Sequence, residues 1–471
     1  MAMGLTAAGI GSGLDVESMI SKLVALQKQP LQQLQTTASS IDTQISTVGS
    51  LKSLMSTLQD AAAKLSDKAA WQLTTAASSN TAVSVKVTGA AAVGASEISV
   101  QQLARSQSLA SQNFANGDTF GPSDPNTPAS LTISMGGKDT AISVTAGMTL
   151  DQLAAAINQK SGGSGVTASV LKDATGERLV MRSQNSGKDN AFTVSVSGGD
   201  ANLSALAYAG QAADGATANG GVVQLAQNAK ATVNGIAVES ATNDFKQTLP
   251  GLSFTVSQVT QAGTSAMVTV VSDTDGMKKN LQTFMDAYNA LNDKLAGTIK
   301  YDSDTKTAGV MQGDSTMVGL SNGLRGVLSS SLGGINLSDL GIQLGKGGKL
   351  AFGTLSADKA KLEAVLQDPA KLAQVFSAPG EDGKPATQGL AVRMKDFTDK
   401  MLQFDTGLFD AKNKSLTKLK TENGKAQDRV NDQAAAFEQR MRAQYTALDT
   451  KMGSYSALSA YMSQQISQWN R

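Results

Sequence analysis

Apolar residues recur every three or four positions near the start of the chain, which is the spacing of one face of a helix. The pattern begins at Val16, Ile20 and Leu23. Pro30 interrupts it, because a proline inside a helix removes a backbone donor and clashes with the preceding turn. The pattern then resumes and contains one extra step of three after Ile45. This step indicates that the apolar stripe, here called the seam, shifts locally around the helix. The residues of this second part are Leu34, Ala38, Ile41, Ile45, Val48, Leu51, Met55, Leu58, Ala62 and Leu65.

A matching seam occupies the C-terminal end of the chain. A helix of about 35 residues, roughly 50 Å long, needs a partner for such a stripe, since neither stripe is broad enough to form a core alone. We therefore predict that the two ends pair in one helical coiled coil that carries everything between Leu65 and Leu416. The C-terminal seam consists of Val430, Ala434, Phe437, Met441, Tyr445, Leu448, Met452, Tyr455, Leu458, Met462, Ile466 and Trp469, preceded at the same spacing by Leu416, Leu419, Asn423 and Ala426.

We expect the coiled coil to make the contacts of an assembly. If the pairing is correct, labels near Met55 and Met441 should approach each other in assembled material. The residues predicted for these contacts are Leu34, Ile41, Ile45, Val48, Met55, Leu58, Val430, Phe437, Met441, Tyr445, Leu448, Met452, Tyr455 and Met462.

Between the two seams, apolar and polar residues first alternate, which is typical of strands. Strands are expected at 83–87 and 98–104, and then a compact module follows with a hairpin at 131–144. A capping box at Thr149 opens a helix over 150–160, and strands follow at 166–171, 178–182 and 192–196. Beyond a Gly/Ala/Asn-rich return at 198–221, strands recur at 231–233, 254–259 and 267–271, with Asn234-Gly235 as a hairpin turn. The α+β module is therefore inserted into a discontinuous β domain.

Helical spacing returns at Asp275. Asp314 and Ser356 are expected to cap further helices, and Pro369 is expected at the first position of another. The predicted fold class is multidomain α and β: a terminal α-helical coiled coil, a helical domain and two β-rich (α+β) domains, the second inserted in the first. The expected boundaries are 1–42 with 416–471 for the coiled-coil leg, 43–75 with 275–415 for the helical domain, 76–107 with 228–274 for the β-rich domain, and 108–227 for the inserted domain.

Composition removes several classes of function. The 471 residues contain 40 Lys and Arg against 39 Asp and Glu, whereas a nucleic-acid binder normally carries a basic face. There is no cysteine and no histidine, which excludes thiolate sites and removes the commonest metal ligand and general base. The N-terminus lacks the basic residues and the following apolar run of a cleaved signal peptide. No apolar run is long enough to span a membrane. We expect no cofactor and no metal.

Three short motifs invite a chemical interpretation. Asp302 and Asp304 lack the third ligand, glycine and glutamate of a calcium loop. The Gly-Lys pairs at 345, 348 and 424 lack the context of a phosphate-binding loop. Gly9, Gly11 and Gly13 have neither a preceding strand nor the spacing of a dinucleotide loop, and Ser12-Gly13-Leu14-Asp15 resembles a capping box instead. We find no catalytic site and expect no enzyme.

Several motifs resemble the flagellar filament cap family (hook-associated protein 2). They are Gly9-Ile10-Gly11-Ser12-Gly13-Leu14-Asp15, Ile98-Ser99-Val100-Gln101-Gln102-Leu103-Ala104, Val233-Asn234-Gly235-Ile236, Leu249-Pro250-Gly251-Leu252, Ala287-Tyr288-Asn289 and Gln444-Tyr445-Thr446-Ala447-Leu448-Asp449. The inserted module, with Ile157-Asn158, Val166-Thr167-Ala168 and Arg178-Leu179-Val180-Met181, resembles the small repeat of flagellins and hook-associated proteins. The resemblance covers nearly the whole chain in the same order.

The resemblance implies a structural cap at the distal end of the bacterial flagellar filament, which promotes folding and insertion of exported flagellin. It implies secretion through the flagellar export channel without a cleaved signal, and a homo-oligomeric ring, a pentamer or a hexamer. Its expected partners are further copies of itself, flagellin, the hook–filament junction protein and a type III export chaperone, with neither nucleic acid nor membrane. Two alternatives stay open: a tip adhesin that binds host mucin or glycan, and a hook–filament junction protein.

Overall fold

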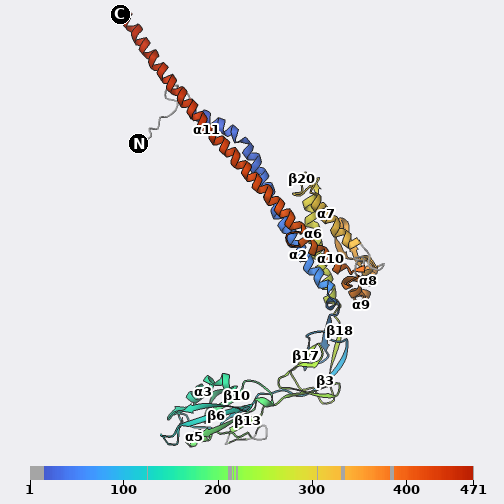
Figure 1. Ribbon diagram of the computed structural model, residues 1–471. Helices are drawn as coiled ribbons and strands as arrows, with labels where there is room; N and C mark the ends of the chain where they lie inside the picture. The colour runs from blue at the N-terminus through green and yellow to red at the C-terminus, as the bar shows by residue number, and fades with distance from the viewer. Residues whose placement is uncertain are drawn as a thin grey trace. The chain divides into compact units, whose positions relative to one another are not determined.

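The computed structural model describes residues 15–124, 126–210, 215, 217–218, 221–304, 306–329, 335–381 and 387–469. The chain forms two compact units. Met1–Trp71 and Asp275–Arg471 form the first, here called the helical unit, and Gln72–Thr274 forms the second, the β unit. The predicted fold class, with terminal helices and β-rich domains, is confirmed (Figure 1). The finer division of each unit into domains stays a prediction.

The helical unit consists of long helices and two short hairpins. Its helices are α1 (Val16–Gln27), α2 (Gln29–Ser66), α6 (Thr274–Ile299), α7 (Ser315–Ser329), α8 (Ser356–Leu366), α9 (Pro369–Ser377), α10 (Leu390–Leu402) and α11 (Leu408–Trp469), with the helical turns η1 (Lys68–Trp71), η3 (Leu337–Leu340) and η4 (Lys346–Gly348). Its hairpins are β19 (Tyr301–Asp302) with β20 (Thr307–Ala308) and β21 (Ile342–Leu344) with β22 (Leu350–Phe352).

The first two helices are separated where the sequence predicted a break. Lys28 lies between α1 and α2, and Pro30 stands in the first turn of α2, where its missing N–H costs no helical hydrogen bond. The cap of α1 differs from the expected capping box. Asp15 is the N-cap, and its Oδ1 accepts from Ser18 N at 3.0 Å. Ser12 and the glycines around it lie outside the described residues.

Trp71 joins three segments of the helical unit. Its ring is fully buried and stacks on Phe376 of α9, with ring centroids 5.0 Å apart. Its Nε1 donates to Leu65 O at 3.0 Å and to Ser377 Oγ at 2.7 Å. The end of α2, the turn η1 and the end of α9 are thereby fixed to one another.

The hairpin β21–β22 is fixed to α6 by amide side chains. Asn289 donates to Leu350 O at 2.7 Å and accepts from Leu350 N at 2.8 Å, while Asn292 donates to Gly347 O at 2.9 Å. Side-chain amides that pair with the backbone of a neighbouring element specify its position, because leaving those backbone groups unpaired would be costly. Residues 345–348 lie in the turn between the two strands of this hairpin.

The β unit contains several antiparallel sheets. A five-stranded sheet has the order β1-β18-β3-β14-β15, and β16-β17-β2 form a second sheet. Further sheets have the orders β12-β13-β4-β10-β9, β11-β6-β7 and β5-β8. The strands are β1 (Thr74–Ser78), β2 (Val83–Val87), β3 (Gly94–Gln102), β4 (Ser108–Ala110), β5 (Thr119–Phe120), β6 (Ala129–Met135), β7 (Lys138–Val144), β8 (Met148–Thr149), β9 (Val166–Asp173), β10 (Gly176–Ser183), β11 (Phe192–Ser197), β12 (Thr217–Ala218), β13 (Gly221–Gln224), β14 (Ala229–Val233), β15 (Ile236–Ser240), β16 (Asp244–Leu249), β17 (Leu252–Val256) and β18 (Ala266–Ser272).

Two separate hydrophobic cores support these sheets. One core contains residues between 83 and 104 together with residues between 229 and 268, so strands far apart in the sequence share it. The other core contains residues between 109 and 223, around the helix α3 (Leu150–Gln159), whose capping box at Thr149 is present as predicted. Short helices α4 (Ser161–Ser164) and α5 (Ala201–Ser204) and the turn η2 (Lys188–Asn190) complete the β unit.

Several local features differ from the predictions. The segment 71–79, where no strand was predicted, contains β1, which pairs along its whole length with β18. The strand β16 was not expected at all. Ser356 is the first residue of α8, whose N-cap is Leu355. In the first two cases hydrogen bonding to a neighbouring strand decides the structure, because the local sequence shows little alternation.

Candidate functional site: the paired terminal helices

The helices α1 and α2 run alongside α11 in the antiparallel sense (Figure 1). Two ion pairs between α2 and α11 mark the register: Lys52 Nζ lies 2.6 Å from Asp410 Oδ1, and Lys420 Nζ lies 2.7 Å from Asp42 Oδ1. As α2 is followed towards its start, its partners lie progressively later in α11. The two ends of the chain thus pair, as the seams predicted.

The helix α1 makes its own small apolar contact with α11. Val16, Ile20 and Val24 are buried there against Ala434. Phe437, Met441 and Tyr445 of α11 pack around them and stay partly exposed. A cluster of this size has few buried neighbours, so it holds α1 less firmly than a domain core would.

Arg442 clamps α1 to α11 at this cluster. Its Nη1 lies 2.7 Å from Glu17 Oε2 and its Nη2 lies 2.5 Å from Glu17 Oε1, so the guanidinium meets the carboxylate with two parallel hydrogen bonds. Its Nε donates to Glu438 Oε1 at 2.9 Å. Paired hydrogen bonds of this geometry fix orientation as well as distance. These hydrogen bonds therefore fix which side of α1 faces α11.

The hydrogen bond from Arg442 lowers the pKa of Glu17 below its ordinary value. A carboxylate whose pKa falls on folding contributes stability above its ordinary pKa. That contribution disappears as the pH falls through the lowered pKa, because protonated Glu17 no longer pairs with the guanidinium. The contact of α1 with α11 should therefore weaken in acid.

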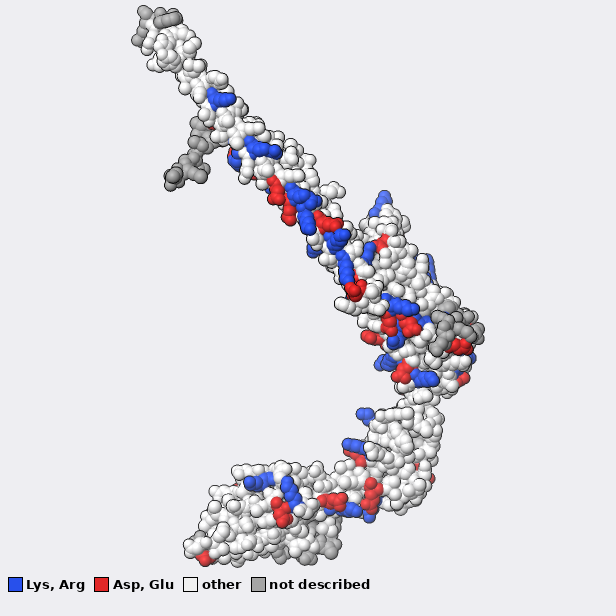
Figure 2. Space-filling model, viewed as in Figure 1, with Lys and Arg blue, Asp and Glu red and all other residues white. Residues whose placement is uncertain are grey.

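C-terminal to the contact with α1, the apolar face of α11 is no longer buried. The apolar side chains that continue the seam become exposed, with Tyr455 65% exposed and Met462 55% exposed. No Lys, Arg, Asp or Glu occurs from Met452 to Trp469. Figure 2 shows blue and red side chains along the paired helices and a far end of the helix that is white. The exposed apolar residues, here called the distal stripe, are Leu448, Met452, Tyr455, Leu458, Met462 and Ile466.

The predicted contact residues fall into three groups in the structure. Those buried are Ile41, Val48, Met55 and Leu58; those partly buried are Leu34, Ile45, Val430, Phe437, Met441 and Tyr445; those exposed are Leu448, Met452, Tyr455 and Met462. Trp469 ends α11, and its side chain lies outside the described residues. Which of these residues make contacts in an assembly stays a prediction.

The structure does not bring Met55 and Met441 together within one chain. α11 begins at Leu408, close to the level of Lys52, so Met55 and Leu58 lie past the start of α11. There α2 runs beside α10, and Gln59 hydrogen-bonds to Asp399. Met441 lies instead at the contact with α1. The seam of α2 therefore faces two different helices along its length.

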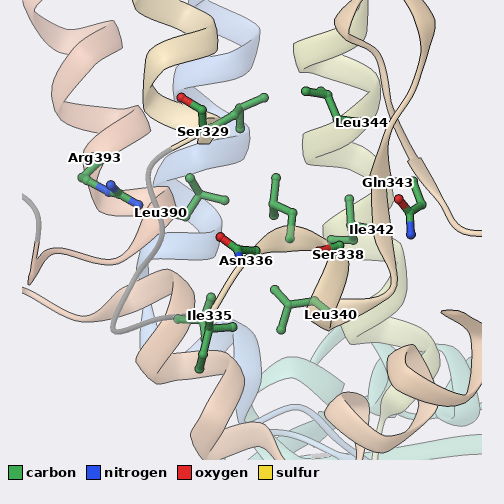
Figure 3. Close-up of a pocket in the computed structure, with 13 residues that line it drawn as sticks. Ser329, Ile335, Asn336, Ser338, Leu340, Ile342, Gln343, Leu344, Leu390 and Arg393 are labelled. Atoms are coloured by element: carbon green, nitrogen blue, oxygen red, sulfur yellow. The ribbon is translucent and has the colours of Figure 1, made fainter.

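A cavity of about 270 Å³ lies elsewhere in the helical unit (Figure 3). Leucine, isoleucine and valine side chains form most of its lining, together with Asn336, Ser338 and Gln343. Arg393 is the one charged residue among the described residues that line it. These described residues include no carboxylate, lysine or nucleophile–base pair, so they offer no arrangement for acid–base or covalent chemistry.

The part of the chain that the structure describes has neither a cluster of metal ligands nor a helix suited to a membrane. No group of three or more Asp or Glu residues there is arranged to hold a metal ion. None of the helices described combines the length and apolarity that a membrane crossing requires.

The sequence patterns did not point to the Arg442 clamp. Glu17 and Arg442 are separated by 425 positions, and each looks like an ordinary exposed charge on a helix. Only the register of the two helices brings them together. A signal was present in retrospect, since Glu438 and Arg442 stand four residues apart on one face of α11.

Replacing Arg442 with methionine should loosen α1 and leave α11 intact. The methionine keeps the apolar stem but loses both hydrogen bonds to Glu17, so amide hydrogen exchange in α1 should become faster, and the difference from the wild type should shrink at high salt. Arg440→Met is the matched control, because Arg440 makes no ion pair with a described residue. Equal exchange in both variants would contradict the assigned role of the clamp.

Comparison with known proteins finds family models that match both ends of the chain and parts of the β unit. Residues 12–107 match the N-terminal model and residues 226–457 the C-terminal model of flagellar hook-associated protein 2. Residues 130–185, inside the inserted module, match the flagellin hook IN motif.

Two relatives match along nearly their whole lengths. Flagellar hook-associated protein 2 of Escherichia coli is 31% identical over 98% of both chains. The B-type protein of Pseudomonas aeruginosa is 31% identical, over 97% of this chain and 95% of its own. A crystal structure of the flagellar cap protein FliD from Escherichia coli, with three domains, superposes with a TM-score of 0.61 at 30% identity, covering 79% of this chain and 99% of that one. The chain therefore belongs to the flagellar hook-associated protein 2 family, a family of structural cap proteins and not of enzymes.

Proposed function

We propose that this chain forms a homo-oligomeric ring at the tip of the flagellar filament, where it promotes the folding and insertion of exported flagellin. In this proposal the paired terminal helices are legs that contact the filament end, and the β units form a plate above it. Flagellin subunits fold in the space beneath the plate, which limits their loss to the medium. Family membership supports the cap; the legs and the folding role rest on the argument that follows.

The distal stripe is the observation that carries the proposal. A monomeric protein gains nothing from a row of exposed leucine, tyrosine and methionine side chains at the end of a long helix, and such patches usually mark interaction sites. The stripe begins where the buried contact with α1 ends, so the seam continues in the same direction with no partner from α1 or α2. In this proposal, apolar faces of the subunits at the filament end cover the stripe. The legs would dock there.

The other partners follow from the route of assembly. A ring of identical chains closes through head-to-tail contacts, and a pentamer or a hexamer would satisfy that geometry. The chain would be exported through the flagellar type III channel with an export chaperone. It would first sit on the hook–filament junction protein before flagellin is added beneath it.

The proposal is tested by placing charges on the distal stripe. Tyr455→Glu together with Met462→Glu puts two carboxylates on the exposed apolar face, where burial against a partner would desolvate them at high cost. In bacteria that lack their own cap protein, this variant should fail to support filament growth and swimming. The isolated variant should keep the wild-type stability, because both side chains are exposed in the single chain.

Ala457→Glu together with Gln464→Glu is the matched control. These residues are also exposed and also seven positions apart, but they lie on the opposite face of α11. The control should support filament growth. Normal filaments from the stripe variant would refute the role of the legs, while monomeric protein that still supports growth would refute the ring.

A further inference from the structure

Five Asn-Gly pairs occur in the chain, at Asn116, Asn219, Asn234, Asn322 and Asn423. Such pairs are chemically labile, because glycine has no side chain to hinder attack of its backbone nitrogen on the preceding side-chain amide. The attack requires rotation about the main chain of the asparagine, so a pair held by hydrogen bonds is protected. The structure describes four of the pairs, all except the one at Asn219.

The pair Asn116-Gly117 lies in an exposed turn of the β unit. The turn is held by Asp118 N, which donates to Ala115 O at 3.0 Å, and by Ala115 N, which donates to Asp118 Oδ2 at 2.8 Å. Neither bond involves the Asn116 side chain or the Gly117 N–H. Both reacting groups are therefore without a hydrogen-bond partner among the described residues, and a single turn has to open for the attack.

The other three described pairs are held in place. Asn234 Oδ1 accepts from Glu97 N at 2.8 Å, and Asn234 N donates to Glu97 O at 2.9 Å, which fixes this hairpin turn to β3. Asn322 lies inside α7, where rotation of its main chain would break the helical hydrogen bonds. Asn423 lies inside α11 and is buried, with its Oδ1 accepting from Gln427 Nε2 at 2.6 Å.

We propose that Asn116 is a site of spontaneous deamidation in the folded protein and the fastest among the four described Asn-Gly pairs. The Gly117 nitrogen gives up its proton to base and forms a bond to the side-chain carbon of Asn116. The side-chain nitrogen leaves as ammonia, and a cyclic imide remains. One water molecule then opens the ring at either carbonyl carbon, which yields aspartate or isoaspartate.

The product changes the surface of the β unit without removing its core. Phe114 and Phe120 flank the turn and contact each other edge to face at 5.0 Å. Phe114 is fixed by two backbone hydrogen bonds to Glu177, both 2.9 Å, and Phe120 is fixed by the pairing of β5 with β8. Isoaspartate lengthens the main chain by one carbon and adds a negative charge near Asp118. An aged protein would therefore carry an altered turn on an intact fold.

The proposal is tested by incubating the full chain at neutral to mildly alkaline pH, folded and in urea, and digesting it at intervals. Peptide mass spectrometry follows the conversion of amide to acid at each pair separately. In the folded protein Asn116 should convert at least about tenfold faster than each of the other three described pairs. In urea the four rates should agree within about a few-fold, because no structure protects any of them.

Two further measurements assign the chemistry. Incubation in heavy-oxygen water should label the product at Asn116, and isoaspartate should form together with aspartate, as expected for ring opening. Asn116→Gln should remove the signal from this peptide and leave the other peptides unchanged. The inference is overturned if Asn116 stays an amide in the folded protein, or if another described pair converts as fast.

Discussion

Replacing Trp71 with alanine should lower the free energy of unfolding of the helical unit by about 3–5 kcal/mol. The indole is fully buried and stacks on Phe376, so its removal leaves a cavity where α2, η1 and α9 meet. The lost hydrogen bonds add little, because Ser377 Oγ still donates to Leu65 O at 2.8 Å. Urea denaturation followed by the helical circular dichroism signal measures the change.

Two variants control this experiment. Trp71→Phe keeps a ring on Phe376 and loses the N–H donor, so it should cost much less, about 1–2 kcal/mol. Gln72→Ala removes an exposed neighbour and should change little. Amide exchange in the β unit provides an internal reference, since that unit has its own cores. A loss for Trp71→Ala no larger than that for Gln72→Ala would show that Trp71 does not join the three segments.

Replacing Gly251 with alanine should destabilise the β unit by about 2–5 kcal/mol. Gly251 follows Pro250 in the turn between β16 and β17, with a φ of +72° that suits the third position of a type II turn. A Cβ at this position would lie 2.4 Å from Ala90 O and 2.5 Å from Ala90 C. These are backbone atoms, so they cannot rotate away. Thermal unfolding of the β unit measures the effect.

Gly263→Ala is the matched control for this substitution. Gly263 has a φ of +77°, nearly the same as Gly251, but a Cβ there would meet no atom within 4 Å. Gly263→Ala should therefore show the cost of the left-handed conformation alone, about 1–2 kcal/mol. The difference between the two variants isolates the contact with Ala90. Equal losses would mean that the close approach of the two segments does not matter for stability.

The sequence predicted helices better than it predicted their partners. The apolar spacing predicted for α2 is present, and its seam is buried. An apolar stripe shows that another element packs against the helix, but it does not identify that element. Near Lys52 that cover is α11, and around Gln59 it is α10. Within one chain Met55 and Met441 belong to different contacts, so the predicted approach of labels at these two residues would have to occur between chains of an assembly.

In the β unit, local turn chemistry and apolar alternation were informative, whereas a strand without alternation was not predicted. The hairpin at Asn234-Gly235 and the capping box at Thr149 depend on neighbouring residues, so the sequence predicted both. The strand β1, with the sequence Thr-Thr-Ala-Ala-Ser, has no apolar alternation. It becomes a strand because β18 offers it hydrogen bonds along its length.

The sequence predicted only part of the candidate site. Periodicity identified which face of α11 is apolar, up to Ile466, because one helix suffices to define a face. It did not separate the part buried by α1 from the exposed distal stripe, since that border depends on where α1 begins to contact α11. The clamp between Glu17 and Arg442 depends on the same register and could not be read from either helix alone.

The absence of charged side chains from Met452 to Trp469 bears on where such a protein can work. Ion pairs weaken as dissolved salt screens them, whereas contacts between apolar surfaces keep or gain strength in saline water. A contact made by the distal stripe would therefore hold in dilute as well as in saline water. Swimming cells could then cross such gradients without shedding the tips of their filaments.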